Sequence, residues 1–160
     1  MVHRAPPSFF LFHMRLLSIV VASSATASFL AAHLADAYLD ERVALLGPWI
    51  GLFPAQNRGI AFGISLPLPL LTILIPLALI AVACAAVQAK TPWSRVAFGL
   101  ILGGAIGNIF DRFPDGTVTD FIQVGAFPLF NIADSCITIG AGMLLLEQIV
   151  EFKKRRSSHS

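Results

Sequence analysis

Long apolar stretches with almost no charge are the feature that most constrains how this chain can fold. Four of them stand out, at about 16–35, 64–89, 96–110 and 135–146. A helix of about 20 apolar residues spans the hydrocarbon core of a bilayer. Of the 160 residues only 12% are charged and 56% are hydrophobic, whereas a soluble domain has about 25% charged residues. The sequence therefore predicts an integral membrane protein and excludes a typical soluble domain.

The predicted fold class is an all-α membrane protein with a small extracytoplasmic segment rich in β-structure. Four transmembrane helices, at about 16–39, 65–88, 93–111 and 131–151, would form one domain over residues 1–160. This length leaves no room for a separate soluble domain. The first stretch keeps a second interpretation, because a basic start, an apolar run and the small residues Ala25-Thr26-Ala27 also fit a cleavable signal peptide.

Lys and Arg residues are distributed unevenly between the two sides of the predicted spans. Eight lie on the side that holds both termini and the loop at 88–95, and three, Arg42, Arg58 and Arg112, lie on the other. Because cytoplasmic loops carry the excess of positive charge, both termini are predicted to be cytoplasmic. The segments near 40–63 and 111–131 then face outward. The small net charge of +2 relates to this orientation and predicts no nucleic-acid partner.

Three glycines in the third predicted span, Gly99, Gly103 and Gly107, recur at every fourth residue. This spacing places them on one helix face, where a neighbouring helix can approach closely. We therefore expect these glycines to serve helix packing.

Four acidic side chains gather on the predicted outward side of the membrane: Asp111, Asp115, Asp120 and Asp134. Ionisable groups at membrane depth are costly, so each calls for a partner or a function. Asp111 has the adjacent Arg112 as its expected partner, and Asp115 lies in the turn sequence Pro114-Asp115-Gly116. Asp120 and Asp134 have no such explanation, which makes them the candidates for chemistry.

Asp120 and Asp134 lie in segments of different kinds. Asp120 belongs to a β-branched and aromatic run at 117–124, which predicts a short extended segment. Asp134 lies where the fourth span begins, and spacings of three and four place it on one helix face with Asn131 and Thr138.

Two carboxylates in a partly desolvated site cannot both ionise easily, so one keeps a proton while the other stays charged. The ionised group can take a proton from an attacking water, and the protonated group can hydrogen-bond to a peptide carbonyl. This is the equipment of an aspartic protease. On these residues alone, a proton relay or an ion site in a small transporter fits equally well.

The positions of the histidines and cysteines give no support to metal chemistry. His3, His13, His33 and His159 lie far along the chain from the acidic group. Neither Cys84 nor Cys136 has a histidine at a useful spacing, and two cysteines cannot form a disulfide framework. We expect no metal and no cofactor.

Four short motifs follow one another along the chain between the predicted spans. They are Asn57-Arg58-Gly59-Ile60-Ala61-Phe62-Gly63, the run Gly103-Gly104-Ala105-Ile106-Gly107-Asn108-Ile109-Phe110-Asp111-Arg112, the run Val118-Thr119-Asp120-Phe121-Ile122, and Phe130-Asn131-Ile132-Ala133-Asp134-Ser135-Cys136-Ile137. In this order they resemble the motifs of the lipoprotein signal peptidase family, the bacterial signal peptidase II enzymes. The resemblance is firm over residues 57–140.

The resemblance implies a four-span aspartic endopeptidase of the bacterial cytoplasmic (inner) membrane. Such an enzyme cleaves diacylglyceryl-modified prolipoproteins just before the lipidated cysteine, at a site toward the extracytoplasmic side. Carried over position by position, it makes Asp120 and Asp134 the catalytic dyad. The residues that it implies for orienting the dyad and the substrate are Asn57, Asn108, Asp111, Arg112 and Asn131. Prolipoproteins and membrane lipid are the expected partners, and we expect a monomer.

The chain departs from the family pattern after its first span. The family usually has an Asp there, followed shortly by Thr or Ser and Lys, whereas this chain has Asp36 but no such Lys. This departure leaves the contribution of the first span and the role of Asp36 open and does not touch the dyad. Two alternatives to an enzyme remain. One is a family member that binds prolipoproteins without cutting them, and the other is a transporter that uses the carboxylates.

Overall fold

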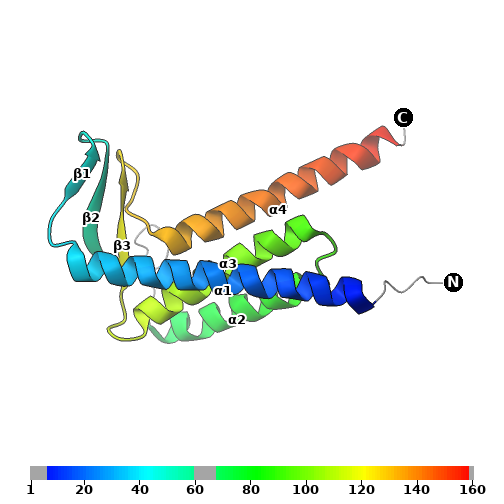
Figure 1. Ribbon diagram of the computed structural model, residues 1–160, viewed down its shortest axis with the longest axis horizontal. Helices are drawn as coiled ribbons and strands as arrows, with labels where there is room; N and C mark the ends of the chain where they lie inside the picture. Colours follow the sequence, from blue (N-terminus) through cyan, green and yellow to red (C-terminus); the bar gives the residue numbers. More distant parts are fainter. Residues whose placement is uncertain (1–6, 60–67, 159–160) are drawn as a thin grey trace.

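The strands of this protein gather at one end of its helices, as the computed structural model shows for residues 7–59 and 68–158, the part of the chain described here. In that part the elements follow in the order α1 (Pro7–Tyr38), β1 (Val43–Leu46), β2 (Ile50–Asn57), α2 (Leu68–Gln88), α3 (Pro92–Arg112), β3 (Val118–Val124) and α4 (Ile132–Ser157). The start of α1, the α2–α3 connection and the end of α4 all lie away from the strands (Figure 1).

Three of the described helices are long and apolar enough to cross a membrane: Leu11–Tyr38, Pro92–Arg112 and Ile132–Ser157. Within α2 the apolar stretch Ile73–Gln88 is, by itself, shorter than a helix that crosses a membrane. Residues 65–67, at the start of the second predicted span, lie outside the described residues. The prediction of a mostly helical fold with a small sheet is confirmed, and α1 and α4 extend beyond the predicted limits of about 16 and 151.

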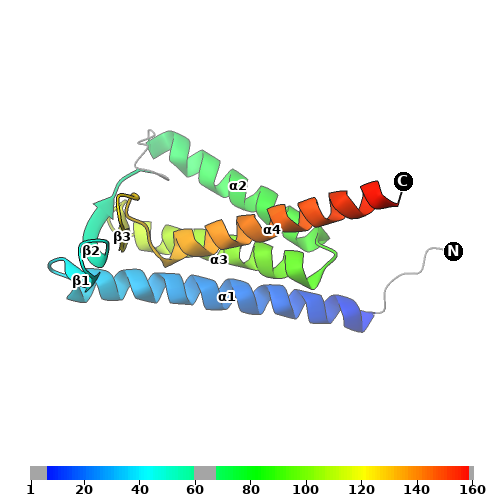
Figure 2. The same cartoon turned by 90° about the horizontal axis from the view of Figure 1, so that it is seen from above.

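α3 is the central helix, because it contacts α1, α2 and α4 (Figure 2). Its predicted glycine face lies against α1. A Cβ atom on Gly103 would lie 2.6 Å from the carbonyl oxygen of Val21, and one on Gly107 would lie 2.6 Å from Cβ of Ser28. Non-bonded carbon atoms prefer about 3.5–4.0 Å, so any larger residue would separate the helices. The predicted packing role of these glycines is confirmed.

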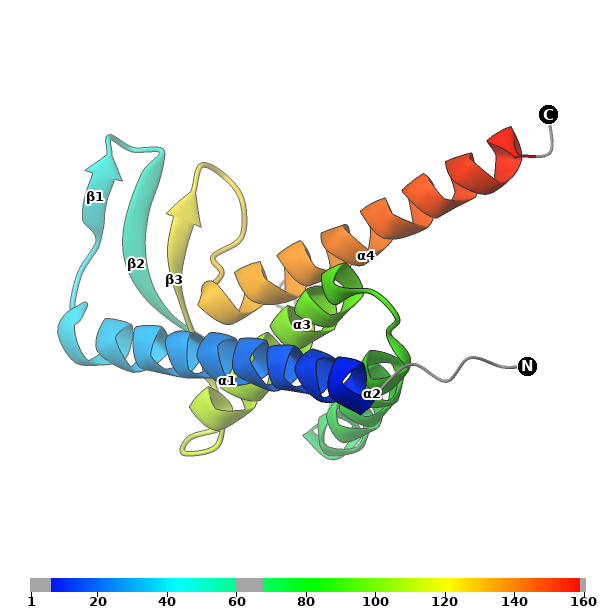
Figure 3. The same ribbon diagram turned by 45° about the vertical axis from the view of Figure 1, so that its right-hand side comes forward.

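The contact between α3 and α4 also depends on glycines, one from each helix. A Cβ atom on Gly104 would lie 2.5 Å from the carbonyl oxygen of Ala133, and one on Gly140 would lie 2.5 Å from that of Ala97. These two close approaches fix how α4 crosses α3. Beyond them the last turns of α4 extend away from the other helices (Figure 3).

The sheet is antiparallel, with the strand order β1-β2-β3. Asn57 pairs with Val118 and Ala55 with Asp120, so the end of β2 lies beside the acidic residue of β3. The β2–β3 register shifts between Leu52 and Ala55, where Pro54 has no N–H to give to the ladder. The predicted extended segment at 117–124 is confirmed as β3.

A short bridge leads the chain from β3 into α4. The carbonyl oxygen of Phe130 accepts hydrogen bonds from the N–H groups of Phe121 at 3.1 Å and Ile122 at 2.8 Å. Asn131 follows directly and is the N-cap of α4. The bridge therefore holds the first turn of α4 against the strand that carries Asp120.

Candidate active site

Asp120 lies on β3 and is only 4% exposed. Asn57, at the end of β2, donates from Nδ2 to Oδ2 of Asp120 at 2.8 Å. Asn131 donates from Nδ2 to Oδ1 at 3.1 Å. Both oxygens of this buried carboxyl group are thus bound by amides that come from two other elements of the fold.

Asp134 lies in the first turn of α4, where it takes part in a capping box with Asn131. The Asp134 N–H donates to Oδ1 of Asn131 at 2.9 Å. In return Oδ2 of Asp134 accepts from the Asn131 N–H at 3.4 Å, and Oδ1 accepts from Nδ2 of Asn108 at 3.0 Å. A carboxylate here is also favoured by the helix dipole.

Two asparagines connect the carboxyl groups. Nδ2 of Asn131 bonds to Asp120 and also donates to Oδ1 of Asn108 at 3.0 Å, and Asn108 in turn donates to Asp134. The side chains therefore form one hydrogen-bonded series, Asp120–Asn131–Asn108–Asp134. β3, α3 and the start of α4 each contribute to it, so the two aspartates that the sequence predicts as a dyad share one network.

A cavity of about 660 Å³ is lined by both aspartates. Its other polar walls come from Asn57, Asn108, Arg112, Ser135 and Thr138, and its apolar walls from Val118, Ile137, Ile139 and residues 127–130. Thr138 was expected on the helix face of Asp134, whereas Ser135, which directly follows Asp134, was not predicted as a site residue. Phe62, in the first of the four motifs, lies outside the described residues.

The burial of Asp120 changes its acidity. Burial raises the pKa of this carboxyl group from 3.8 to about 6, although the hydrogen bond from Asn57 acts in the opposite direction. The negative charge of Asp134 raises the pKa of Asp120 further. Asp120 therefore takes up a proton at a pH where an ordinary aspartate is ionised.

Arg112, at the end of α3, also reaches the cavity. Its Nη2 donates to the carbonyl oxygen of Gly59 at 2.7 Å, and the Gly59 N–H donates to Oδ1 of Asn57 at 2.8 Å. Arg112 thereby fixes the backbone that orients Asn57. Four of the five predicted surrounding residues, Asn57, Asn108, Arg112 and Asn131, thus meet at or directly behind the cavity.

Asp111, the fifth, lies elsewhere. It lines a separate cavity of about 280 Å³, and its Oδ2 accepts from the N–H of Thr119 at 2.6 Å. The expected ion pair with Arg112 is wrong, since Asp111 binds the backbone of Thr119 while Arg112 binds the backbone of Gly59. Because α3 ends with Asp111 next to Arg112, successive side chains point to different sides, one toward each cavity.

The other carboxylates near this second cavity have local partners. Asp115 accepts from the N–H and the hydroxyl of Thr117, both at 2.8 Å, and these bonds lower the pKa of Asp115. Its predicted role in a turn is confirmed. Asp36 accepts from Nε2 of Gln56 at 2.8 Å. Across residues 7–59 and 68–158, no group of three His, Cys, Asp or Glu side chains could hold a metal ion.

The family model and the similar sequences all point to the same protein family. The model of the family described as signal peptidase (SPase) II matches residues 16–150. The lipoprotein signal peptidase of Chlorobium luteolum is 35% identical over 151 residues, which cover 85% of this chain and 89% of that protein. The lipoprotein signal peptidase of Shouchella clausii is 36% identical over 124 residues, which cover 75% and 82%.

Two solved structures share the fold, and both are described as bacterial membrane enzymes determined by the in meso method. The first, at 2.3 Å resolution, has a TM-score of 0.79 and 24% identity, with 86% of this chain and 90% of that chain covered. The second, at 1.9 Å resolution, has a TM-score of 0.74 and 25% identity, with 82% and 91% covered.

Proposed function

This chain belongs to the signal peptidase II family, and on that premise we propose that it removes the signal peptide from diacylglyceryl-modified prolipoproteins. The bond cleaved is the one just before the lipidated cysteine. The enzyme is a membrane aspartic endopeptidase whose dyad is Asp120 and Asp134. The observation that carries this proposal is the hydrogen-bonded series of Asn131 and Asn108 that joins the two aspartates beside one cavity.

The two aspartates divide the acid and base roles. Asp120 carries the proton, and its raised pKa supports this role. Asp134 is the base, and the amide of Asn108 donates to its Oδ1. A water loses a proton to Asp134 and attacks the peptide carbonyl carbon, while the proton of Asp120 moves to the carbonyl oxygen.

The second step breaks the peptide bond. The tetrahedral carbon expels the nitrogen of the lipidated cysteine, which takes the proton held by Asp134. The hydroxyl that was the carbonyl oxygen returns its proton to Asp120, so both carboxyl groups end as they began. Neither a metal nor a covalent intermediate is required.

Asn57 and Arg112 orient the reacting groups. Asn57 donates to Oδ2 of Asp120 and Asn131 donates to Oδ1. The carboxyl group therefore keeps a fixed orientation at the cavity. Arg112 secures the backbone at Gly59 and presents the rest of its guanidinium to the cavity. There it can donate to the substrate backbone and stabilise charge that develops on the carbonyl oxygen.

We further propose that residues 1–160 form one domain with four spans, α2 included, in the cytoplasmic membrane of a bacterium. Both termini are cytoplasmic, and the sheet and dyad are at the extracytoplasmic side. The uneven distribution of Lys and Arg supports this orientation. We also propose that the protein acts as a monomer.

Membrane lipid contributes to substrate binding. The acyl chains of the substrate stay in the bilayer, where each buried CH₂ group is worth about 0.8 kcal/mol. The lipid anchor thus concentrates the substrate in the plane of the enzyme. The apolar wall formed by residues 127–130 and α4 suits a substrate that approaches from that plane.

A gel-shift assay tests the proposal. Purified protein in detergent is incubated with a diacylglyceryl-modified prolipoprotein and, in parallel, with its unmodified precursor. Wild type is expected to release the signal peptide from the modified form, while Asp120→Asn and Asp134→Asn release none. Cleavage of neither form by folded wild type would contradict the proposal and favour a family member that binds prolipoproteins without cutting them.

A further inference from the structure

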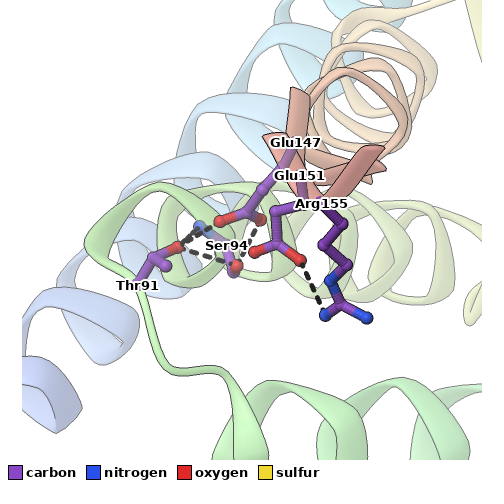
Figure 4. Close-up of polar contacts among 5 residues, drawn as sticks. All are labelled: Thr91, Ser94, Glu147, Glu151 and Arg155. Carbon is purple, nitrogen blue, oxygen red and sulfur yellow. Dashed lines mark hydrogen bonds and ion pairs between the residues drawn. The ribbon is translucent and has the colours of Figure 1, made fainter. Parts of the chain in front are cut away.

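A second polar cluster lies at the other end of the α3–α4 pair, and we name it the Glu147 cluster: Thr91, Ser94 and Glu147 (Figure 4). Thr91 donates from Oγ1 to Oε1 of Glu147 at 2.6 Å, and the Ser94 hydroxyl donates to Oε2. Thr91 is also the N-cap of α3 and accepts from the Ser94 N–H at 2.9 Å. Both oxygens of Glu147 are therefore bound to the first turn of α3.

Glu147 meets α3 at the N-terminus of that helix. The N-terminus of a helix carries a partial positive charge. A neighbouring bond adds a second attachment, since Nε1 of Trp93 donates to the carbonyl oxygen of Met143 at 2.9 Å. Residues 143 and 147 are one turn apart and share a helix face, so three hydrogen bonds at two successive turns join α4 to the start of α3.

Glu147 is also the last residue of α4 that is not exposed. Every residue at 148–158 is exposed, and this part of the helix extends away from the others (Figure 3). On the other side of Glu147, the close approach at Gly140 and Ala97 fixes the crossing of the two helices. The glycine contacts hold α4 against α3 between Ala133 and Gly140, and the Glu147 cluster adds a hydrogen-bonded attachment further along the same helix, which resists rotation of α4 about these contacts.

Asp134 lies on the same helix, about 20 Å away at 1.5 Å per residue. An α-helix is stiff over this length, so a tilt at Glu147 moves Asp134 relative to Asn108 and Asp120. We propose that Glu147 is a positioning residue, which holds α4 in the orientation that presents Asp134 to the dyad. This inference rests on the proposed function of Asp120 and Asp134.

Glu151 offers a matched control, because it lies one turn further along α4. Its carboxylate pairs with Arg155 of the same helix at 3.8 Å and is drawn beside Glu147 in Figure 4. An ion pair within one exposed helix adds little to stability, and this one joins α4 to no other element. Glu151→Ala should therefore leave the orientation of α4 unchanged.

Cleavage kinetics give the first test. Glu147→Ala is expected to lower kcat about tenfold to a hundredfold, the effect of a misplacement of about 1 Å, with KM nearly unchanged. The pH at which activity is half lost should also move, because the proton affinity of Asp120 depends on the nearby charge of Asp134. Glu147→Gln keeps one carbonyl oxygen for the hydroxyls and should restore most of kcat.

A purely structural role would lower the amount of folded enzyme and leave the pH profile in place. Wild-type kcat and pH profile in Glu147→Ala would overturn the inference, as would an equal loss in Glu151→Ala.

A distance measurement tests the same inference without cleavage. The parent protein carries Cys84→Ser and Cys136→Ser. Spin labels are attached at Lys90→Cys, in the α2–α3 connection, and at Lys154→Cys, near the end of α4. Pulsed electron paramagnetic resonance then reports the distance between the two labels. Glu151→Ala should keep the distance distribution of the parent, whereas Glu147→Ala should shift or broaden it. An unchanged distribution in Glu147→Ala would contradict the inference, even if the wild type proved unable to cleave prolipoproteins.

Discussion

The two ends of the α3–α4 pair use similar contacts for different purposes. At each end a carboxylate of α4 accepts hydrogen bonds from polar side chains of α3, Asp134 from Asn108 and Glu147 from Thr91 and Ser94. Only at the first end does a second carboxyl group, Asp120, join the network beside a cavity of about 660 Å³. A carboxylate that is hydrogen-bonded between two helices can serve packing alone, and the second carboxyl group and the cavity are what distinguish the first end from the other.

The two ends also differ in how well they stabilise charge. Glu147 has a hydroxyl for each oxygen and the N-terminus of α3 beside it. Asp120 is 4% exposed, and the cost of burying its charge raises its pKa to about 6. A site that retains such a cost despite the loss of stability is typical of function.

The dyad should act as a unit. Asp120→Asn and Asp134→Asn should each reduce kcat about 10³-fold, within the range for loss of an acid or base. The double variant should be no slower than either single one, because residues that act together are strongly non-additive. Single-turnover rates of cleavage measure this. Losses that multiply in the double variant would contradict a shared role.

The close approach of α4 to α3 at Gly140 lies between Asp134 and Glu147, and we expect the contacts of both carboxylates with α3 to depend on it. Gly140→Leu introduces a side chain where even a Cβ atom would lie 2.5 Å from the carbonyl oxygen of Ala97. We expect a loss of about 1–3 kcal/mol of stability and a large loss of cleavage, measured by thermal unfolding in detergent and by the gel-shift assay.

Gly142→Leu is the control for that variant, because a Cβ atom at Gly142 would meet nothing within 4 Å. Equal effects of the two substitutions would show that the α3–α4 contact does not support the site.

The pH dependence of cleavage should respond to Asn57. Its hydrogen bond favours the ionised form of Asp120 and lowers the pKa of that group. Asn57→Ala should therefore raise the pKa of Asp120 further. Since cleavage needs the proton on Asp120, the alkaline limb of kcat/KM should move to higher pH.

Gln56→Ala is the matched control, because Gln56 is the neighbouring residue but lines the second cavity. A limb that moves to lower pH in Asn57→Ala would contradict the assignment of the acid.

Stability should depend on pH through the same group. The pKa of Asp120 rises from 3.8 to about 6 on folding, so between these pH values the folded state holds a proton that the unfolded chain releases. Stability therefore falls as pH rises through this window. Asp120→Asn lacks this titration, and its Tm relative to wild type should rise by a few degrees from acid to neutral pH. A difference in Tm independent of pH would show that Asp120 has an ordinary acidity.

The fold could be predicted from the sequence where the signal is local. The apolar runs predicted the helices, and the β-branched run at 117–124 predicted β3. The spacing of Gly99, Gly103 and Gly107 predicted a helix-packing face. The ends of α1 and α4 were missed because a helix can continue past the apolar stretch that predicts it. The last turns of α4 are exposed and rich in Lys and Arg, so they carry no apolar run.

The site could be predicted only in part, because its contacts join distant parts of the chain. The four motifs named Asn57, Asn108, Asp120 and Asp134, and the structure connects them. Asp111 was expected to bind Arg112 next to it in sequence but instead binds the backbone of Thr119. Adjacent residues at the end of a helix point in different directions, and sequence alone does not tell which segment each one meets.

The Glu147 cluster was not predicted for the same reason. Thr91 and Ser94 show a helix start, and Glu147 reads as one charge near the end of an apolar helix. Their meeting depends on the crossing angle of α3 and α4, which the glycine contacts set in three dimensions. No local pattern encodes that angle.

The measurement that tests the central claim most directly neutralises one carboxylate at each end of α4. Asp134→Asn and Glu147→Gln are compared with wild type in one cleavage assay on a diacylglyceryl-modified prolipoprotein, with folding checked by thermal unfolding. Folded Asp134→Asn should cleave about 10³-fold more slowly than wild type, while Glu147→Gln should cleave within about tenfold of wild type. Wild-type cleavage by Asp134→Asn, or equal inactivity of both folded variants, would contradict the account.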